Sequence, residues 1–201
     1  MAIELKNIHK SYGEKKVLQN MSLTLHPGEI SCLMGASGIG KTTVVNILAG
    51  ITSPDSGEII WPSPLSVSVV FQEDRLLEWE TALTNVLFVT RRGDRPRSSD
   101  FKLEAVRLLT KVGLADSINK KTAELSGGMK RRVAICRALI TNPSFLLLDE
   151  PFKGLDSETK PIIMNMVKQH LTKENYMLCV THDLSEVEFL NGKIISTRYS
   201  Q

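Results

Sequence analysis

Short apolar runs alternate along this chain with stretches of helical periodicity. Runs typical of strands occupy 3–8, 17–25, 29–34, 57–60, 67–71, 145–148, 177–180 and 193–196. Helical patterns occupy 41–49, 101–112, 127–140 and 157–172. The runs 29–34, 145–148 and 177–180 are almost wholly apolar, as expected of strands covered on both faces. The alternation predicts an α/β fold with a largely parallel central sheet.

The strand pattern is interrupted once by a long helical stretch. From about Thr81 the apolar residues recur at steps of three and four, and the next buried run begins only at Phe145. We therefore expect a single domain over 1–201, with a core formed by about 1–72 and 143–201. The residues of about 73–142 would form a small helical subdomain.

Composition and charge exclude several classes of protein. The chain has 201 residues, 42% of them hydrophobic, with 25 Lys and Arg against 22 Asp and Glu. A net charge of +3 does not indicate a nucleic-acid-binding protein, for which a strongly basic domain is expected. No apolar stretch approaches the roughly 18 residues of a membrane span, and Glu4 and Lys6 stand where a signal peptide would have its apolar core. A cytoplasmic protein is predicted.

The cysteines do not indicate a metal site or a disulfide framework. Cys32, Cys136 and Cys179 lie far apart in apolar neighbourhoods, without the short spacing that zinc ligands have. We expect them to be buried, reduced thiols.

A phosphate-binding loop is the clearest chemical motif. GASGIGKT at 35–42 fits G-x-x-x-x-G-K-[ST], follows an apolar strand and opens a helix. Its glycines allow several backbone N–H groups to face one phosphate chain, and the helix N-terminus adds partial positive charge. Lys41 would approach the β- and γ-phosphates, and the Thr42 hydroxyl would bind Mg²⁺. The expected nucleotide contacts are Gly35, Ala36, Ser37, Gly38, Ile39, Gly40, Lys41, Thr42 and Thr43.

Two carboxylates end a buried strand further along the chain. Asp149 and Glu150 follow the apolar run 145–148, and ligands of such sheets bind at the carboxyl ends of strands. Asp149 would hold Mg²⁺ through its water shell, and Glu150 would orient or deprotonate the attacking water. Alone this pattern is weak, but together with the phosphate loop it indicates hydrolysis of a nucleoside triphosphate.

A third motif opens the helix 127–140. Ser126 is a favourable N-cap, and Gly127 and Gly128 leave backbone N–H groups unobstructed before Met129. The motif reads either as a second phosphate cradle or simply as a capped helix start.

Taken in order, these motifs resemble an ATP-binding cassette (ABC) nucleotide-binding subunit. GASGIGKTT, LSGGM and LLLDEP follow one another as in that family, and LSGG upstream of LLLDEP is specific to it among P-loop ATPases. The resemblance covers essentially the whole chain. It implies a P-loop NTPase core with a mostly parallel sheet, N-terminal antiparallel strands and a helical subdomain, with ATP and Mg²⁺ as ligands.

The resemblance also implies roles for further residues. Tyr12 matches the aromatic residue that stacks on adenine, and Val17 packs beside it. Gln72 matches the glutamine that reaches Mg²⁺ and the attacking water, and Asp156 matches an aspartate that crosses a dimer interface. His182 matches a histidine that contacts the γ-phosphate, although a histidine after a buried strand is by itself more often structural.

In the family the motif Ser126–Met129 binds the γ-phosphate held by the opposite subunit. The resemblance therefore implies a homodimer in the ATP state, in which Lys41 and Glu150 of one chain work with that motif of the other. It also implies integral-membrane permease subunits as partners, which would hold the chain at the inner face of the membrane, and a separate solute-binding protein.

A narrower resemblance concerns the segment FQEDRLLEWETALTNV at 71–86. It is similar to importers of nitrate, sulfonates, taurine and related small solutes, although that group usually has Pro where Glu78 stands. Compared with the family, the chain also has a shorter loop before Gln72 and a shorter stretch between His182 and the last strands. The arginine-rich stretch 91–99 reads as a solvated loop or as a contact with a partner or anionic lipid.

Other functions remain as alternatives. An ABC exporter ATPase is disfavoured by the segment 71–86. A soluble ABC ATPase of translation or DNA repair would need tandem cassettes or a long coiled-coil insertion. A P-loop kinase would not need LSGGM or Glu150, and a non-catalytic module would be expected to lack Lys41 or Glu150.

Overall fold

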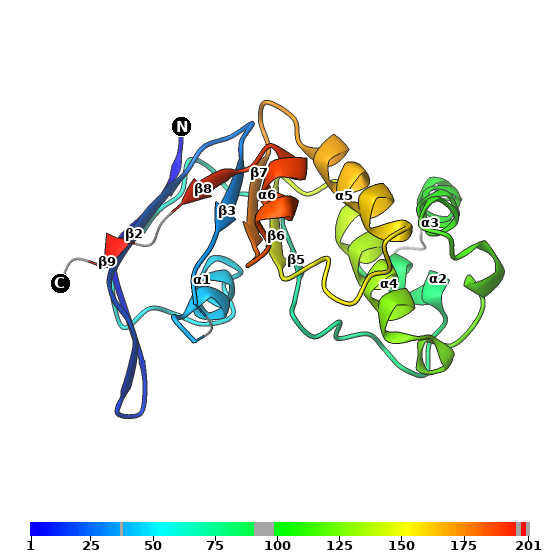
Figure 1. Cartoon of the computed structure of the whole chain (residues 1–201), viewed down its shortest axis with the longest axis horizontal. Coiled ribbons are helices and arrows are strands. Elements are labelled where there is room, and N and C mark those ends of the chain that lie inside the picture. The colour runs from blue at the N-terminus through cyan, green and yellow to red at the C-terminus, as the bar shows by residue number, and fades with distance from the viewer. Residues whose placement is uncertain (37, 91–98, 196–197, 200–201) are drawn as a thin grey trace. The chain divides into compact units, whose positions relative to one another are not determined.

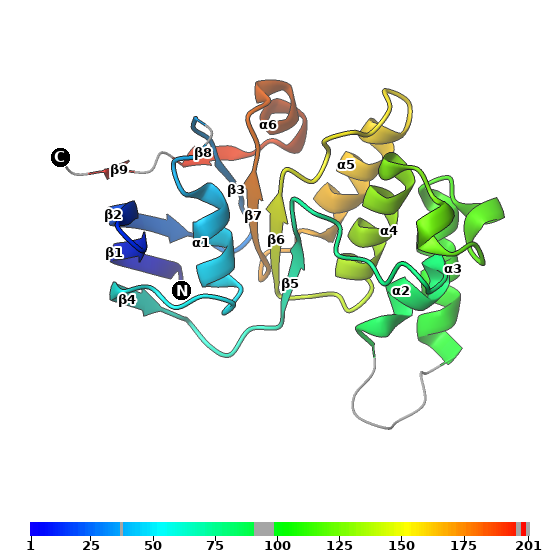
Figure 2. The ribbon, with the colours of Figure 1, turned by 90° about the horizontal axis from the view of Figure 1, so that it is seen from below.

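The computed structural model describes residues 1–36, 38–90, 99–195 and 198–199 (Figures 1 and 2). The expected contact Ser37 and nearly all of the arginine-rich stretch 91–99 lie outside the described residues. The chain forms two compact units. The first contains Met1–Val69, Ser144–Glu150 and Leu171–Gln201, and the second contains Val70–Pro143 and Pro151–His170.

The first unit begins with an antiparallel sheet in the order β4-β1-β2-β9. Its strands are β1 (Ile3–Tyr12), β2 (Lys15–Leu25), β4 (Ser56–Ile60) and β9 (Arg198–Tyr199). β1 and β2 form a hairpin whose turn contains Gly13 at φ 59°, a conformation that glycine adopts without strain.

A second sheet of the first unit has the order β5-β6-β7-β3-β8. Its strands are β3 (Ile30–Leu33), β5 (Val67–Val70), β6 (Phe145–Asp149), β7 (Tyr176–Val180) and β8 (Lys193–Ile195). β3 pairs in parallel with both β7 and β8, and β6 pairs in parallel with β7. The carboxyl ends of β3, β6 and β7 therefore meet at one edge.

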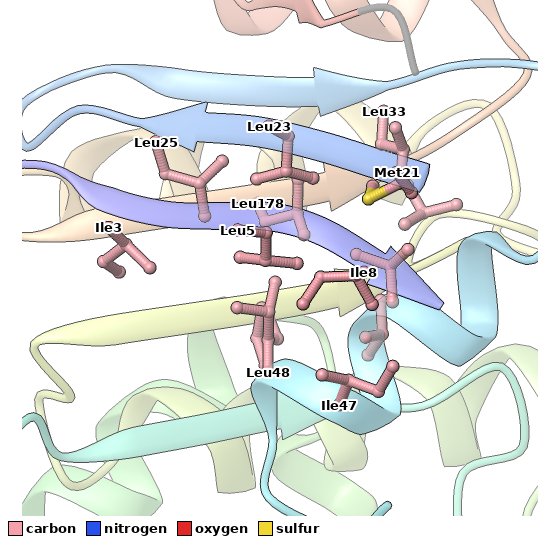
Figure 3. Close-up of a cluster of buried hydrophobic side chains, with 14 of the residues drawn as sticks. Ile3, Leu5, Ile8, Met21, Leu23, Leu25, Leu33, Ile47, Leu48 and Leu178 are labelled. Atoms are coloured by element: carbon pink, nitrogen blue, oxygen red, sulfur yellow. The ribbon is translucent and has the colours of Figure 1, made fainter. Parts of the chain in front are cut away.

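Helix α1 (Lys41–Leu48) lies between the two sheets (Figures 1 and 2). Five of its eight residues are buried, four of them apolar. Figure 3 shows side chains of β1, β2, β3, β7 and α1 packed in one cluster. The cluster includes Ile3, Leu5, Ile8, Leu23, Leu33, Ile47, Leu48 and Leu178. Because each buried Leu or Ile contributes about 1.5–3 kcal/mol, this core holds the strand that enters the phosphate loop against the helix that leaves it.

The first unit also contains α6 (Leu184–Leu190), which precedes β8. Asp183 caps this helix by accepting a hydrogen bond from the Ser185 N–H. Helix α6 is not predictable from the sequence pattern, because seven residues are too few to show a clear helical period.

The second unit is helical. It contains α2 (Ala82–Phe88), α3 (Ser99–Lys111), α4 (Gly127–Leu139) and α5 (Thr159–His170), with short 3₁₀ turns at Ala115–Ser117 and Thr122–Glu124. Helix α4 contacts the other three helices. Consistent with this central place, its residues from Val133 to Cys136 are all buried.

The predicted α/β fold with a parallel sheet, N-terminal antiparallel strands and a helical part is confirmed. The first two strands are longer than predicted, because β1 and β2 continue to the turn at Gly13. Pro151–His170 contacts the helical unit, whereas the sequence-based division, which remains a prediction, placed it with the core.

All three cysteines are buried, as expected, and burial raises the pKa of the Cys136 thiol to about 12. No helix among the described residues is long and apolar enough to cross a membrane.

Candidate nucleotide-binding site

The phosphate loop is the first candidate feature of the site. It joins β3 to α1, and Gly40 stands at the N-cap position of the helix with φ 95°. The Lys41 ammonium donates hydrogen bonds to the Gly35 and Ala36 carbonyls, each over 2.7 Å. The loop thus curls around the lysine, and the first turn of α1 leaves backbone N–H groups for an anion.

Glycine is required at position 40 by both conformation and space. A Cβ on Gly40 would lie 2.6 Å from Leu18 Cδ2 and 3.0 Å from Val17 Cγ1. This close approach places Val17, on β2, directly against the phosphate loop. The residue expected beside the adenine and the loop expected around the phosphates are therefore neighbours in the structure.

The remaining residues of this region differ in exposure. Tyr12 ends β1 with 49% of its surface exposed, so its ring is available to a ligand. Thr42 is exposed at the start of α1, whereas Thr43 is buried.

The two carboxylates after β6 have different surroundings. Asp149 is the last residue of the strand and is 2% exposed. Glu150 follows with φ 47°, a left-handed conformation that costs a non-glycine residue of order 1 kcal/mol or more. Its N–H donates to the Val180 carbonyl over 3.0 Å, which fixes this bend at the end of the sheet. Such a strained backbone is typical of functional positions.

His182 lies beside Glu150. The His182 Nδ1 atom is 3.6 Å from Glu150 Oε1, and the histidine side chain is 68% exposed. Thr181, the preceding residue, donates a hydrogen bond to the buried carboxylate of Glu186 in α6 and accepts one from the Asp183 N–H. The adjacent strands β6 and β7 therefore bring a carboxylate and an imidazole together, and α6 anchors the segment that carries the imidazole.

In the second unit, the motif 126–129 forms the start of α4. The Ser126 hydroxyl accepts a hydrogen bond from the Met129 N–H over 3.3 Å, which is an N-cap. A Cβ on Gly127 would meet open space, whereas one on Gly128 would lie 3.0 Å from the Gly154 carbonyl oxygen. The helix start is thus open on the Gly127 side and close to the loop before α5 on the other.

Gln72 lies in a segment that α4 holds in place. Arg131 is 6% exposed, and its guanidinium donates hydrogen bonds to the Phe71 and Gln72 carbonyls. Its Nε atom lies 3.1 Å from Asp74 Oδ1, in an ion pair that lacks hydrogen-bond alignment. Arg137 donates to the Asp74 and Arg75 carbonyls, each over 2.8 Å. Two arginines of the helix that follows the Ser126 motif therefore fix the backbone around Gln72.

Asp156 has a local structural contact. Its carboxylate accepts hydrogen bonds from the Thr159 N–H over 2.8 Å and from the Thr159 hydroxyl over 2.7 Å, at the start of α5. These bonds hold the pKa of Asp156 below its usual value, so the carboxylate is ionised at neutral pH.

The predicted site residues thus form two groups. The first unit contains Tyr12, Val17, Gly35–Thr43, Asp149, Glu150 and His182, and the second contains Gln72, Ser126–Met129 and Asp156. The sequence did not indicate the residues that fix the backbone around Gln72, namely Arg131, Arg137 and Asp74. Nor did it indicate Thr181 and Glu186, which anchor the segment that carries His182. A charged residue on the apolar side of a helical pattern, as Arg131 is, was the only signal available.

The oxygen donors present fit Mg²⁺ bound together with a nucleotide. A threonine hydroxyl and one or two carboxylates, completed by phosphate oxygens and water, are a usual ligand set for this ion. Within the described ranges there is no group of three or more His, Cys, Asp or Glu residues that could hold a metal by themselves.

A sheet whose strand ends carry a phosphate loop and paired carboxylates defines a P-loop nucleotide-binding protein. The sequence profile of the ABC transporter family matches residues 18–153. The chain belongs to this family.

Individual relatives agree with this assignment. The chain is 39% identical over 197 residues to the aliphatic sulfonates import ATP-binding protein SsuB 2 of Pseudomonas syringae pv. syringae, covering 96% of this chain and 68% of the relative. It is 42% identical over 196 residues to the SsuB protein of Corynebacterium glutamicum, covering 96% and 79%. It is also 36% identical over 208 residues to the sulfate/thiosulfate import ATP-binding protein CysA of Pectobacterium atrosepticum, covering 97% and 63%.

A solved structure matches the fold closely. The dimeric structure of a post-hydrolysis state of the ATP-binding cassette MJ0796, bound to ADP and Pi, has a TM-score of 0.85 and 33% sequence identity. The match covers 97% of this chain and 94% of the other. The chain is accordingly an ATPase of the ABC family, with ATP and Mg²⁺ as its ligands.

Proposed function

We propose that this chain is the ATP-hydrolysing subunit of a bacterial importer for a small anionic or organic solute. Support comes from the relatives, whose names describe import ATP-binding proteins for aliphatic sulfonates and for sulfate or thiosulfate. The alternatives, an exporter ATPase and an ABC ATPase outside transport, have no such support among these relatives. The partners would be integral-membrane permease subunits and a separate solute-binding protein.

The first unit would bind the nucleotide. Tyr12 and Val17 would contact the adenine, and the loop Gly35–Gly40 with Lys41, Thr42 and Thr43 would hold the phosphates. Thr42 and Asp149 would hold Mg²⁺, which supplies positive charge against the phosphate oxygens. The family resemblance assigns Gln72, a residue of the second unit, to the same ion. The exposed ring of Tyr12 and the packing of Gly40 on Val17 support this division of roles.

Glu150 and His182 would act on the attacking water and the γ-phosphate. The carboxylate would orient the water and accept its proton, and the imidazole would contact the γ-phosphate. The observation that carries the proposal is the 3.6 Å approach of His182 Nδ1 to Glu150 Oε1 at the carboxyl ends of β6 and β7. The left-handed backbone of Glu150 supports a functional reason for this arrangement.

The second unit would complete the site of a second copy. Across a homodimer interface, the motif Ser126–Met129 would contact the nucleotide bound to the other chain, and Asp156 would contact the other chain. Each ATP would therefore need residues from two chains. The open space around Gly127 supports this role, because a phosphate can approach the N–H groups there. The permease would hold two copies close together at the inner face of the membrane.

Two substitutions test the catalytic roles. Lys41→Ala should weaken ATP binding by about 10- to 100-fold, since a charge-assisted contact contributes about 1.5–3 kcal/mol. Glu150→Gln should retain ATP binding and lose hydrolysis, because the amide cannot accept a proton. Binding is measured by titration calorimetry and hydrolysis by phosphate release. The matched control is Lys120→Ala at an exposed lysine.

The shared site is tested by concentration. The ATPase rate per chain should rise with protein concentration, and the Glu150→Gln protein should form a dimer with ATP but not without it. Ser126→Arg should abolish this rise while leaving ATP binding intact. A rate per chain that stays flat, with no dimer of the Glu150→Gln protein, would contradict the proposal of a shared site.

Import is tested separately from hydrolysis. The chain is combined with permease subunits and the solute-binding protein in vesicles that contain ATP, and uptake of a radiolabelled sulfonate or sulfate is followed. ATP-dependent accumulation supports import, whereas ATP-dependent loss of preloaded solute would favour the exporter alternative.

A further inference from the structure

The end of strand β1 that carries Tyr12 has a sheet partner on one edge only. β1 pairs with β4 as far as His9, which lies opposite Ser56, and the described residues of β4 reach no further along β1. On its other edge β1 pairs with β2 to the last residue, Tyr12 opposite Lys15. Figure 1 shows this hairpin projecting past the end of α1. Its last three residues therefore have a strand partner on the β2 edge alone.

Asp55, the residue before β4, provides that partner. Its N–H donates to the His9 carbonyl over 2.9 Å. Its carboxylate accepts hydrogen bonds from the Ser11 N–H over 2.6 Å and from the Lys10 ammonium over 2.7 Å. Asp55 thus takes the place of a further strand along the outer edge of β1, up to the N–H of Ser11, the residue before Tyr12. The bond from Lys10 and that from Ser11 hold the pKa of Asp55 below its usual value, so the carboxylate is charged at neutral pH.

Lys10 connects this contact to the aromatic ring. Its side chain is 15% exposed, and its ammonium lies 5.6 Å from the centroid of the Tyr12 ring. A cation at this distance is attracted to the face of an aromatic ring. Because the ion pair with Asp55 fixes the ammonium, the cation favours one position of the ring rather than following its motion.

We propose that Asp55 is a positioning residue for nucleotide binding, which fixes the end of β1 and, through Lys10, the Tyr12 ring against which adenine stacks. This inference rests on the proposed role of Tyr12. A fixed ring loses less conformational freedom when the base binds, so the contact improves affinity for the nucleotide without touching it. The effect is specific to the base, because the phosphates are held by the loop before α1.

The experiment compares a ligand with a base and a ligand without one. The dissociation constants of ATP and of inorganic tripolyphosphate are measured by titration calorimetry on the full chain. Asp55→Ala should raise the dissociation constant of ATP by about three- to tenfold, the usual range for loss of one or two hydrogen bonds, and change that of tripolyphosphate less than about twofold. In the ATPase assay KM should rise with little change in kcat.

Two further variants separate positioning from folding. Asp55→Asn keeps an acceptor for the Ser11 N–H and loses the ion pair with Lys10, so its effect on ATP should be intermediate. Adding Asp55→Ala to Tyr12→Ala should cause no further loss of ATP affinity, because the ring is already absent. The control is Glu58→Ala on β4, an exposed carboxylate for which the described structure records no ion pair or side-chain hydrogen bond.

The outcomes are distinguishable. An equal loss of affinity for ATP and tripolyphosphate, or additive effects of Asp55→Ala and Tyr12→Ala, would overturn the positioning role. If Tyr12→Ala itself leaves ATP affinity unchanged, the proposed role of Tyr12 fails and the inference fails with it. Loss of ATP affinity in Tyr12→Ala but not in Asp55→Ala refutes the inference and leaves the proposed function in place.

Discussion

Removing the Arg131 side chain should destabilise the helical unit strongly. Arg131 is 6% exposed and reaches three groups of the segment 71–74, namely the carbonyls of Phe71 and Gln72 and the carboxylate of Asp74. In Arg131→Met the apolar stem is retained, but all three contacts are lost.

The magnitude follows from these contacts. Each hydrogen bond from a charged donor contributes about 1.5–3 kcal/mol, and breaking a buried ion pair by removing one partner costs about 3–5 kcal/mol. Burial already raises the pKa of Asp74, against the opposing charges of Arg131, Arg137 and Lys130. These contributions are not additive, because one side chain makes all three contacts and Arg137 and Lys130 remain near Asp74. We therefore take the loss of one partner of a buried ion pair as the measure and expect about 4 kcal/mol.

The assay is thermal unfolding followed by calorimetry. For a chain of this size 1 kcal/mol corresponds to about 2–4 °C, so the unfolding transition of the chain should fall by roughly 8–16 °C. The matched control is Arg107→Met on α3, where the arginine is 74% exposed and paired with Glu104, and this change should cost less than about 1 kcal/mol. The destabilisation by Arg131→Met should be smaller at pH 5 than at pH 8, because protonation of Asp74 removes its uncompensated charge.

A second substitution tests the mechanism directly. Asp74→Asn in the Arg131→Met background should recover part of the lost stability, since a neutral amide is cheaper to bury than a carboxylate without its partner. A loss below about 1 kcal/mol for Arg131→Met, or no recovery in the double variant, would refute the reasoning that this arginine holds the segment around Gln72.

Two further predictions concern the phosphate loop and the pH dependence of stability. Gly40→Ala should lower the free energy of unfolding by about 1–3 kcal/mol and abolish ATP binding, because the added Cβ would lie 2.6 Å from Leu18 Cδ2. The control is Gly50→Ala, at φ 71° with open space around the added Cβ. Stability is measured by urea unfolding and binding by calorimetric titration, and equal losses in both variants would contradict the steric argument. Burial lowers the pKa of His170, whose Nε2 lies 3.0 Å from the Pro143 carbonyl oxygen. The contribution of the neutral imidazole to stability should therefore be complete above about pH 6.5, the pKa in the unfolded chain, and be lost as the pH falls from there through the lowered pKa of the folded protein. His170→Gln should flatten the decline of the urea midpoint between about pH 7 and 5, and an unchanged slope would contradict this.

The fold class and the residues of the local motifs can be predicted from the amino-acid sequence alone. The phosphate loop and the cap at Ser126 are predictable because their geometry depends on a few consecutive residues and on the glycines among them. The buried strands before Leu33, Asp149 and Val180 are predictable for a similar reason, since each is a short run of apolar residues. Their parallel order follows from the helices between them.

Contacts between residues far apart in the sequence can be seen in the tertiary structure but not in the sequence. The approach of His182 to Glu150 depends on the pairing of β6 with β7, and the clamp of Asp55 on β1 depends on a contact between residues 44 positions apart. The hold of Arg131 on the segment around Gln72 similarly spans about 60 positions. Such contacts combine common residue types at no fixed spacing. They form because the burial of apolar faces elsewhere brings the segments together, and the polar groups then pair within the space that packing leaves.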